Sequence, residues 1–208
     1  MKATPKIFDL HYWKFPIVIL ALCFPIAALG DLGRSCFRYE ASALEQWQLW
    51  RWITGHITHL GWSHYILNGC GLLAVWLLYG RQFSARFWTY IFLLCSAGIS
   101  LGFYLFNANL TYYVGLSGVL HGALAAALTA GLTRAIFTND VKLAPEDVII
   151  TAGLILKILY EQLMGAVPLT QSLSGDTVIV DAHFYGAVIG SLVALLRELA
   201  KQLKNVRI

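Results

Sequence analysis

The chain of 208 residues is 58% hydrophobic and only 12% charged. Soluble domains are about 45–50% apolar and about 25% charged, so this composition excludes an ordinary soluble protein and indicates an integral membrane protein. The formal net charge of +4 reflects where the basic residues fall along the chain, and it does not indicate a nucleic-acid-binding protein. The four cysteines have no CxxC or Cys/His metal spacing, and we expect them to act as small buried hydrophobes.

Apolar segments predict an all-α membrane protein with six spans in a single domain, residues 1–208. The first segment contains Pro16 and Pro25 and competes with a signal peptide, but it lacks a convincing cleavage site and five more spans follow. Residues 31–61 lack a continuous apolar run, so they are expected to form a long outer loop. The predicted helices cover residues 15–30, 62–79, 87–105, 116–137, 148–165 and 179–199.

The distribution of Lys and Arg predicts the orientation in the membrane. Eleven of the 15 basic residues fall on the side of both termini, and three fall on the other side. Because cytoplasmic loops carry the excess of Lys and Arg, both termini are predicted to be cytoplasmic. The start of the fourth helix then faces the extracytoplasmic side. The eleven are Lys2, Lys6, Lys14, Arg81, Arg86, Arg134, Lys142, Arg197, Lys201, Lys204 and Arg207, and the three are Arg34, Arg38 and Arg51.

The segment from Gly115 to Gly122 places a serine, Ser117, at the first turn of the fourth predicted helix. Gly115 and Gly118 leave room beside the hydroxyl. The unpaired backbone N–H groups at a helix start can face a developing oxyanion. Small residues also permit close helix packing in membranes, so this segment alone leaves a catalytic and a packing interpretation open.

His183 lies near the outer end of the sixth predicted helix, at a depth similar to that of Ser117. Gly186 and Gly190 follow it, and opposite the glycines of the fourth helix they favour a close crossing of the two helices. Such a crossing brings an imidazole within hydrogen-bond reach of a hydroxyl, which is the minimal arrangement for an activated serine nucleophile.

Three acidic or basic residues near these helices have simpler explanations. Lys157 and Glu161 are four residues apart on one helical face, so mutual neutralisation accounts for both. Asp181 is two residues from His183 and therefore lies on a different helical face. A Ser/His/Asp triad through Asp181 is not expected.

His64 and Asn68 are four residues apart and project from one face of the second predicted helix. They can form an oxyanion site or a pair of interhelical hydrogen bonds, and their spacing leaves both open. His56 and His59 raise the question of a metal site, but without a Cys or carboxylate partner and without an HExxH motif we expect no zinc there.

Together these motifs resemble the rhomboid intramembrane serine proteases over roughly residues 45–199. Gly-x-Ser-Gly alone would be a weak signal, whereas the ordered set is specific. The matching residues are Trp50 and Arg51, then His59 with His64 and Asn68, then Gly115, Ser117 and Gly118, and finally Ala182 and His183 with Gly186 and Gly190.

The resemblance implies a six-helix bundle with Ser117 as nucleophile and His183 as general base and acid, a dyad without a carboxylate. His64, Asn68 and the Ser117 backbone N–H would form the oxyanion hole. Arg51 would help to shape the outer loop, and no metal or cofactor is implied. Many rhomboids have a tyrosine four residues after the serine, where this chain has His121, so His121 could stack, donate a hydrogen bond or compete as the base.

The residues within and around these motifs most resemble those of the rhombosortases, a bacterial branch of the family. The implied substrates are secreted or surface proteins that end in a Gly-Gly motif, a hydrophobic helix and a basic tail. This implies a multi-pass protein of the bacterial cytoplasmic membrane, in contact with lipids and not with nucleic acid, and with its site on the extracytoplasmic side. The alternatives are an inactive rhomboid-like protein that binds transmembrane partners and, less favoured, a small transporter.

Overall fold

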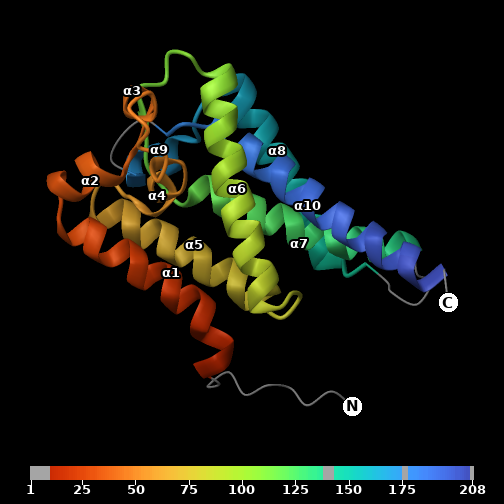
Figure 1. The fold of residues 1–208 in the computed structure, drawn as a ribbon. Helices are drawn as coiled ribbons and strands as arrows, with labels where there is room; N and C mark the ends of the chain where they lie inside the picture. Colours follow the sequence, from red (N-terminus) through yellow and green to blue (C-terminus); the bar gives the residue numbers. More distant parts are fainter. Residues whose placement is uncertain (1–9, 138–142, 175–177, 207–208) are drawn as a thin grey trace.

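The computed structural model describes residues 10–137, 143–174 and 178–206, and within these ranges the chain is mainly helical (Figure 1). Its strands form one antiparallel pair in the described part of the chain. The elements are α1 (Leu10–Ala28), α2 (Asp31–Phe37), β1 (Tyr39–Glu40), α3 (Ala41–Leu44), α4 (Arg51–Thr54), the 3-10 helix η1 (Gly55–Ile57), α5 (Trp62–Tyr79), α6 (Ala85–Phe106), β2 (Tyr112–Tyr113), α7 (Ser117–Phe137), α8 (Pro145–Met164), α9 (Pro168–Ser174) and α10 (Asp181–Val206).

Helix α7 is the centre of the bundle. It contacts α10, α6, α5 and α8, and Figure 1 shows α1 and α5 on one side of it and α8 and α10 on the other. The buried positions of α7 are mainly alanine and glycine, which let neighbouring helices approach closely. Larger core side chains lie at the interfaces with the surrounding helices, among them Trp76, Trp88, Ile91 and Phe103.

Three of the described helices are long and apolar enough to cross a membrane, namely α6, α7 and α10. Helices α1 and α2 pass the same test together, but the chain bends by 118° between them, so they count as one broken span at most. Helix α8 is 20 residues long and carries charged residues near both ends, with Glu146 near its start and Glu161 near its end. The protein is therefore a helical, multi-pass membrane protein.

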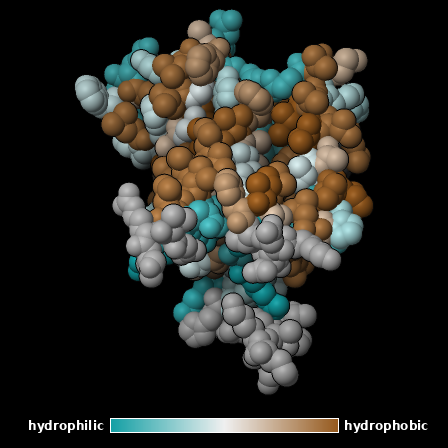
Figure 2. Space-filling model, turned by 90° about the vertical axis from the view of Figure 1, so that its right-hand side faces the viewer, coloured by the Kyte–Doolittle hydropathy of each residue, from teal (hydrophilic) through white to brown (hydrophobic). Residues whose placement is uncertain are grey.

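The outer surface supports the same conclusion. Figure 2 shows a broad band of hydrophobic side chains across one face of the molecule, with hydrophilic residues above and below it. The exposed apolar residues of α8 and α10 include Ile149, Leu156, Leu163 and Leu196, which are between 65% and 81% exposed. An exposed apolar surface of this kind is stable only in contact with lipid or another apolar partner.

Residues 31–61, which the sequence predicts as a long outer loop, contain several short helices and one strand. Arg51 holds this segment together from within, because its side chain is buried and donates hydrogen bonds of 2.8 Å to the carbonyl oxygens of Arg38 and Ser35. Its Nε atom donates a further bond of 2.8 Å to Gln48 Oε1. Each nitrogen of the guanidinium thus donates to an acceptor, which offsets the cost of burying a charge.

This outer segment also fixes the chain that leads into α7. Strand β1 pairs with β2, with Tyr39 opposite Tyr113. The backbone N–H of Gly115 donates to the Gly55 carbonyl oxygen at 3.1 Å. A Cβ at Gly55 would lie 2.7 Å from the Tyr39 backbone nitrogen, so only glycine fits at this close approach.

Some predictions from the sequence differ from the structure, and others concern residues that the structure does not describe. Of the cysteines, Cys23 and Cys95 are buried as expected. Cys36 and Cys70 are exposed, so the prediction was wrong for these two. Cys70 is exposed because the face of α5 that holds it turns outward. Both chain ends and four of the basic residues counted for orientation lie outside the described residues. These four are Lys2, Lys6, Lys142 and Arg207.

Candidate active site

Ser117 is the first residue of α7, and the turn before it depends on a glycine. Gly115 has a φ of +128°, a conformation that residues with a Cβ rarely adopt. A Cβ at this position would also lie 2.9 Å from two ring atoms of His64. Gly115 therefore allows the sharp turn and the close approach of the His64 ring at the same point.

The crossing of α7 and α10 brings Ser117 and His183 together. A Cβ at Gly186 would overlap the carbonyl oxygen of Gly118, and a Cβ at Gly190 would overlap that of Gly122. The two backbones are thus in direct contact, as the small-residue spacing of both helices predicts. Because the two backbones touch, the side chains of Ser117 and His183 come close to each other although they belong to different helices.

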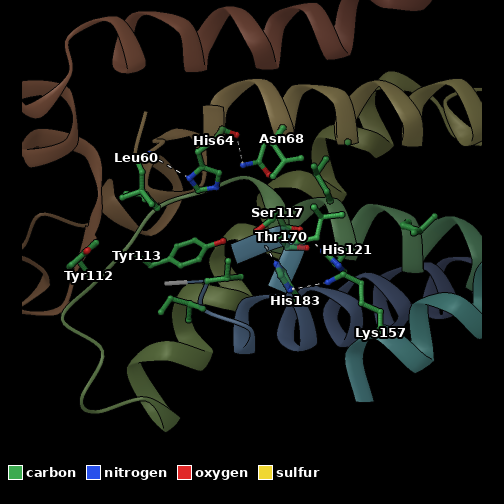
Figure 3. A pocket seen from close by; sticks show the side chains of 18 of the residues that line it. Leu60, His64, Asn68, Tyr112, Tyr113, Ser117, His121, Lys157, Thr170 and His183 are labelled. Atoms are coloured by element: carbon green, nitrogen blue, oxygen red, sulfur yellow. Dashed lines mark hydrogen bonds between the residues drawn. The ribbon is translucent and has the colours of Figure 1, made fainter. Parts of the chain in front are cut away.

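His183 Nε2 lies 3.0 Å from Ser117 Oγ, within hydrogen-bond distance (Figure 3). The histidine is 1% exposed, so bulk water does not compete for its ring. A hydroxyl whose oxygen contacts a buried imidazole nitrogen can lose its proton to that nitrogen as the oxygen attacks an electrophile.

His121 stacks on His183, with ring centroids 4.0 Å apart and an angle of 19° between the planes. Its Nδ1 lies 2.8 Å from the Ser117 carbonyl oxygen. Because a carbonyl oxygen only accepts hydrogen bonds, Nδ1 must carry the proton of the His121 ring. Of the roles that the sequence left open, the geometry favours stacking together with this backbone hydrogen bond.

A carboxylate on α8 also reaches the histidine, and sequence reasoning missed this contact. Glu161 Oε2 lies 2.8 Å from His183 Nδ1, and Lys157 Nζ lies 2.6 Å from Glu161 Oε1. The ion pair with Lys157 is present as expected, but it uses only one of the two carboxylate oxygens. The expectation of a dyad without a carboxylate is therefore incomplete. The signal that could have found it is an acidic residue fully inside an otherwise apolar segment.

Asp181 does not reach His183 Nδ1. Its carboxylate instead accepts a hydrogen bond of 2.5 Å from Asn107 Nδ2 at the end of α6. Tyr185 also donates to Asn107, at 2.8 Å from its Oδ1 atom. Asp181 thus helps to join the outer ends of α6 and α10, as its place on a different helical face suggested.

His64 and Asn68 lie on the opposite side of Ser117 from His183 and His121 (Figure 3). Both are buried on α5, and Asn68 Nδ2 donates to the His64 carbonyl oxygen at 3.1 Å. Within the described residues, neither side chain makes a hydrogen bond to Ser117, and all three residues line the same cavity. Tyr113, which the sequence analysis did not single out, donates to the Gly115 carbonyl oxygen at 2.8 Å.

These groups line one cavity of about 650 Å³. Its walls come from α5, from the loop before α7, from α7 itself and from α9, while Lys157 and His183 contribute polar groups at one end. Most of the remaining lining is apolar, including Leu67, Val75, Leu120 and Leu124. The cavity therefore combines a small polar centre with a hydrophobic surround large enough for several residues of an extended peptide.

The rhomboid domain matches residues 46–198 of the chain, which is most of its length. The chain belongs to the rhomboid family. No curated protein matches it. The matched region contains all the residues of the candidate site, from Arg51 to His183, and the family supports intramembrane protease activity in general.

The rhomboid site could in principle also hold a metal ion, because His121, Glu161 and His183 each offer a ligand atom within 4.8 Å of the others. Their hydrogen bonds argue against this use. Both ring nitrogens of His183 contact protein partners, and the Lys157 ammonium lies 2.6 Å from the same carboxylate. A metal would have to displace these contacts and sit beside a positive charge, so the arrangement favours proton transfer over metal ligation.

The other two histidines considered from the sequence, His56 and His59, make contacts that support the fold. His56 Nε2 contacts Ser100 Oγ at 3.1 Å, and the His59 ring lies edge-on to that of His64, with centroids 5.2 Å apart. Burial lowers the pKa of both His56 and His59 to about 3. Both are therefore neutral at ordinary pH, and they support the outer segment and the His64 ring from behind.

Proposed function

We propose that this rhomboid is an intramembrane serine endopeptidase in which Ser117 is the nucleophile and His183 is the general base. The observation that carries the proposal is the distance of 3.0 Å between Ser117 Oγ and His183 Nε2 in a buried site beside a largely apolar cavity. Serine hydroxyls without such a base are weak nucleophiles at neutral pH.

The reaction is an acyl transfer. Ser117 Oγ attacks the carbonyl carbon of a substrate peptide bond while its proton moves to His183 Nε2. The C–N bond then breaks, and the same proton passes from His183 to the leaving amine. Water, or an amine acceptor, then gives a proton to Nε2 and attacks the ester carbon. The bond between that carbon and Ser117 Oγ breaks, and Nε2 returns the proton to Oγ, so both residues regain their starting forms.

The negative charge on the carbonyl oxygen during attack needs donors. Ser117 begins α7, so its backbone N–H has no partner within the helix and can point at the oxyanion. The His64 ring and the Asn68 amide line the cavity opposite His183, which supports their assignment as the remaining donors. Asn68 Nδ2 uses one of its two protons on the His64 carbonyl oxygen and keeps the other for a ligand.

The substrate class that we propose is a secreted or surface protein with a C-terminal Gly-Gly motif, a hydrophobic helix and a basic tail, as in the rhombosortase branch. The apolar lining of the cavity suits a hydrophobic segment, and glycines near the scissile bond would let that segment unwind to an extended form. The leaving fragment is the hydrophobic helix with its basic tail, and the enzyme would cut it off while that helix is embedded in lipid.

We further propose six membrane spans, with α5 and α8 added to α1, α6, α7 and α10, and with both termini in the cytoplasm of a bacterium. The excess of Lys and Arg on the side of the termini supports this orientation. Ser117 at the start of α7 and His183 near the start of α10 would then face the extracytoplasmic side, where secreted substrates arrive.

The test is co-expression with a reporter that ends in Gly-Gly, an apolar helix and a basic tail. Mass spectrometry of the reporter should reveal a new C-terminus at or near the Gly-Gly motif with the wild-type protein, and only the intact reporter with Ser117→Ala. Stable co-purification of an uncleaved reporter with the wild-type protein at every time point would instead support a binding protein without protease activity.

A further inference from the structure

The polar atoms around His183 form a continuous series from α7 to α8. Ser117 Oγ lies 3.0 Å from Nε2, and Glu161 Oε2 lies 2.8 Å from Nδ1. Lys157 Nζ lies 2.6 Å from the other carboxylate oxygen, Oε1. The Glu161 side chain is 0% exposed, whereas that of Lys157 is 31% exposed and reaches the cavity. Three helices thus supply one hydrogen-bonded series that ends on an ammonium group.

The tautomer of the His183 ring decides whether it can act as a base. Nε2 can accept the Ser117 proton only if it carries no proton of its own. A carboxylate accepts hydrogen bonds, so the Glu161 contact requires the ring proton on Nδ1 and leaves Nε2 free. Lys157 Nζ is 3.4 Å from the same Nδ1, and an ammonium there would select the opposite tautomer. The carboxylate contact is shorter by about half an ångström, and Lys157 already donates to Glu161.

We propose that Glu161 is a positioning residue that holds His183 in the tautomer able to accept the Ser117 proton, and that Lys157 fixes the carboxylate in place. The inference rests on the proposed function, because it needs His183 to act as the base. When the proton reaches Nε2, the ring becomes an imidazolium, and the buried carboxylate stabilises that charge in a site with little water. The site is then a Ser–His–Glu triad built from α7, α10 and α8.

A second buried glutamate, Glu198, forms ion pairs but has no hydrogen bond to a histidine among the described residues. Glu198 on α10 is 2% exposed and pairs with Arg197 and Lys201, and both of its oxygens contact the Lys201 ammonium. Glu161 instead divides its oxygens between a lysine and a histidine. Glu198→Gln is therefore a matched control for the loss of a buried, paired carboxylate.

The discriminating variant is Glu161→Gln. The introduced amide has a single oxygen, which Lys157 should take, so its NH₂ group faces Nδ1 and donates to it. This selects the tautomer with a protonated Nε2, and the rate of fluorophosphonate labelling of Ser117 should fall by up to about 10⁴-fold, the loss of rate known for a triad histidine in the wrong tautomer. Glu161→Asp keeps an acceptor and should retain more of the rate.

Adding Lys157→Met to Glu161→Gln separates this mechanism from simple loss of structure. Without the lysine, the amide oxygen is free to accept from Nδ1, so the double variant should label at least about 10-fold faster than Glu161→Gln alone. Glu198→Gln should label at the wild-type rate. The thermal unfolding midpoint of each variant is measured in the same detergent.

The tautomer itself is read by NMR of protein labelled with ¹⁵N-histidine, with His183→Gln used to assign the ring signals. The wild-type ring should be protonated on Nδ1, and the ring in Glu161→Gln on Nε2. If Glu161→Gln is labelled at the wild-type rate, or if the His183 ring of the wild type is protonated on Nε2, the proposal is overturned while the proposed function stays intact. If the wild-type protein does not label at all, the proposed function fails, and the wild-type spectrum still decides the tautomer.

Discussion

His183 is held by contacts on both ring nitrogens and on one ring face. Ser117 and Glu161 occupy the nitrogens, and His121 stacks on the face with centroids 4.0 Å apart. A ring fixed in this way loses little conformational freedom when a substrate binds, and its Nε2 atom already points at the hydroxyl. At the scale of single residues, the arrangement is ordered before any substrate arrives.

The residues opposite His183 give a prediction about the oxyanion. Replacing either His64 or Asn68 with alanine should lower the cleavage rate of a reporter by about 10²–10³-fold, the usual cost of removing one oxyanion donor. Fluorescence-based size-exclusion chromatography should show that both variants remain folded. Cys70→Ala, an exposed position on the same helix, is the matched control. Wild-type cleavage rates in both variants would rule out an oxyanion role for α5.

The sequence could predict the meeting of Ser117 and His183 but not the third partner. The glycines on both helices indicated a close crossing, and the start of each helix set the depth of each residue. Glu161 was hidden because Lys157, four residues away, already explained it as an ion pair. Which face of α8 turns toward α10 depends on tertiary packing, and the sequence of α8 alone carries no such information.

At the scale of elements, the site depends on the contact between α7 and α10. These helices approach so closely that a Cβ at either Gly186 or Gly190 would overlap the opposite backbone. The same glycines fix the depth at which the helices cross, one to two turns below His183. Small changes in this contact should move the imidazole relative to the hydroxyl.

The crossing can be tested with two alanine substitutions. Gly190→Ala should destabilise the folded protein by about 1–3 kcal/mol, as overpacking generally does, and should slow labelling of Ser117. Gly153→Ala is the matched control, because Gly153 is exposed on α8 and a Cβ there meets nothing within 4 Å. It should leave the labelling rate unchanged and raise the unfolding midpoint slightly. Equal midpoints for the two variants would contradict this view of the crossing.

The outer segment of residues 31–61 was the least predictable element. Its apolar residues are too few for a span, so the sequence indicated a loop. The buried Arg51, which supplies hydrogen bonds to backbone carbonyls far along the segment, gives it a fixed fold. Hydrogen bonds between distant backbone groups leave no periodic pattern in the sequence, so reasoning from periodicity could not find them.

At the scale of the whole molecule, composition was enough to predict a helical membrane protein, and the hydrophobic band in Figure 2 agrees with it. The predicted helix over residues 62–79 coincides with α5, whereas α10 continues to Val206, beyond the predicted end at residue 199. The later residues of α10 include Lys201 and Lys204, and sequence reasoning ended the helix where the apolar run ended. The helix continues because its backbone bonds do not require apolar side chains.

The outer segment predicts how stability depends on pH. Burial lowers the pKa of His56 and His59 to about 3, whereas in the unfolded chain both have the ordinary value of about 6.5. Between these values the unfolded state binds more protons, so their contribution to stability is complete above about pH 6.5 and is lost as the pH falls toward 3.

The free energy of unfolding in detergent should therefore decrease as the pH is lowered from 7 to 5, by at most about 1.4 kcal/mol per pH unit for each histidine, and the unfolding midpoint should decrease with it. His56→Gln can keep a hydrogen bond to Ser100 but has no charge to gain, so the slope should be shallower in this variant. Hydrogen bonding to Arg38 lowers the pKa of Glu40, and its contribution is lost only at more acidic pH. A midpoint that does not change between pH 7 and pH 5 would show that neither histidine is buried in the neutral form.

If Ser117 is a nucleophile activated by His183, a fluorophosphonate should attach covalently to its Oγ atom, and the position of that adduct can be mapped. The purified protein in detergent is treated with the probe, digested and mapped by mass spectrometry. We expect a single adduct on Ser117 in the wild type and none in Ser117→Ala or His183→Ala. An adduct that persists in Ser117→Ala, or the absence of any adduct on folded wild-type protein, would contradict this role of Ser117.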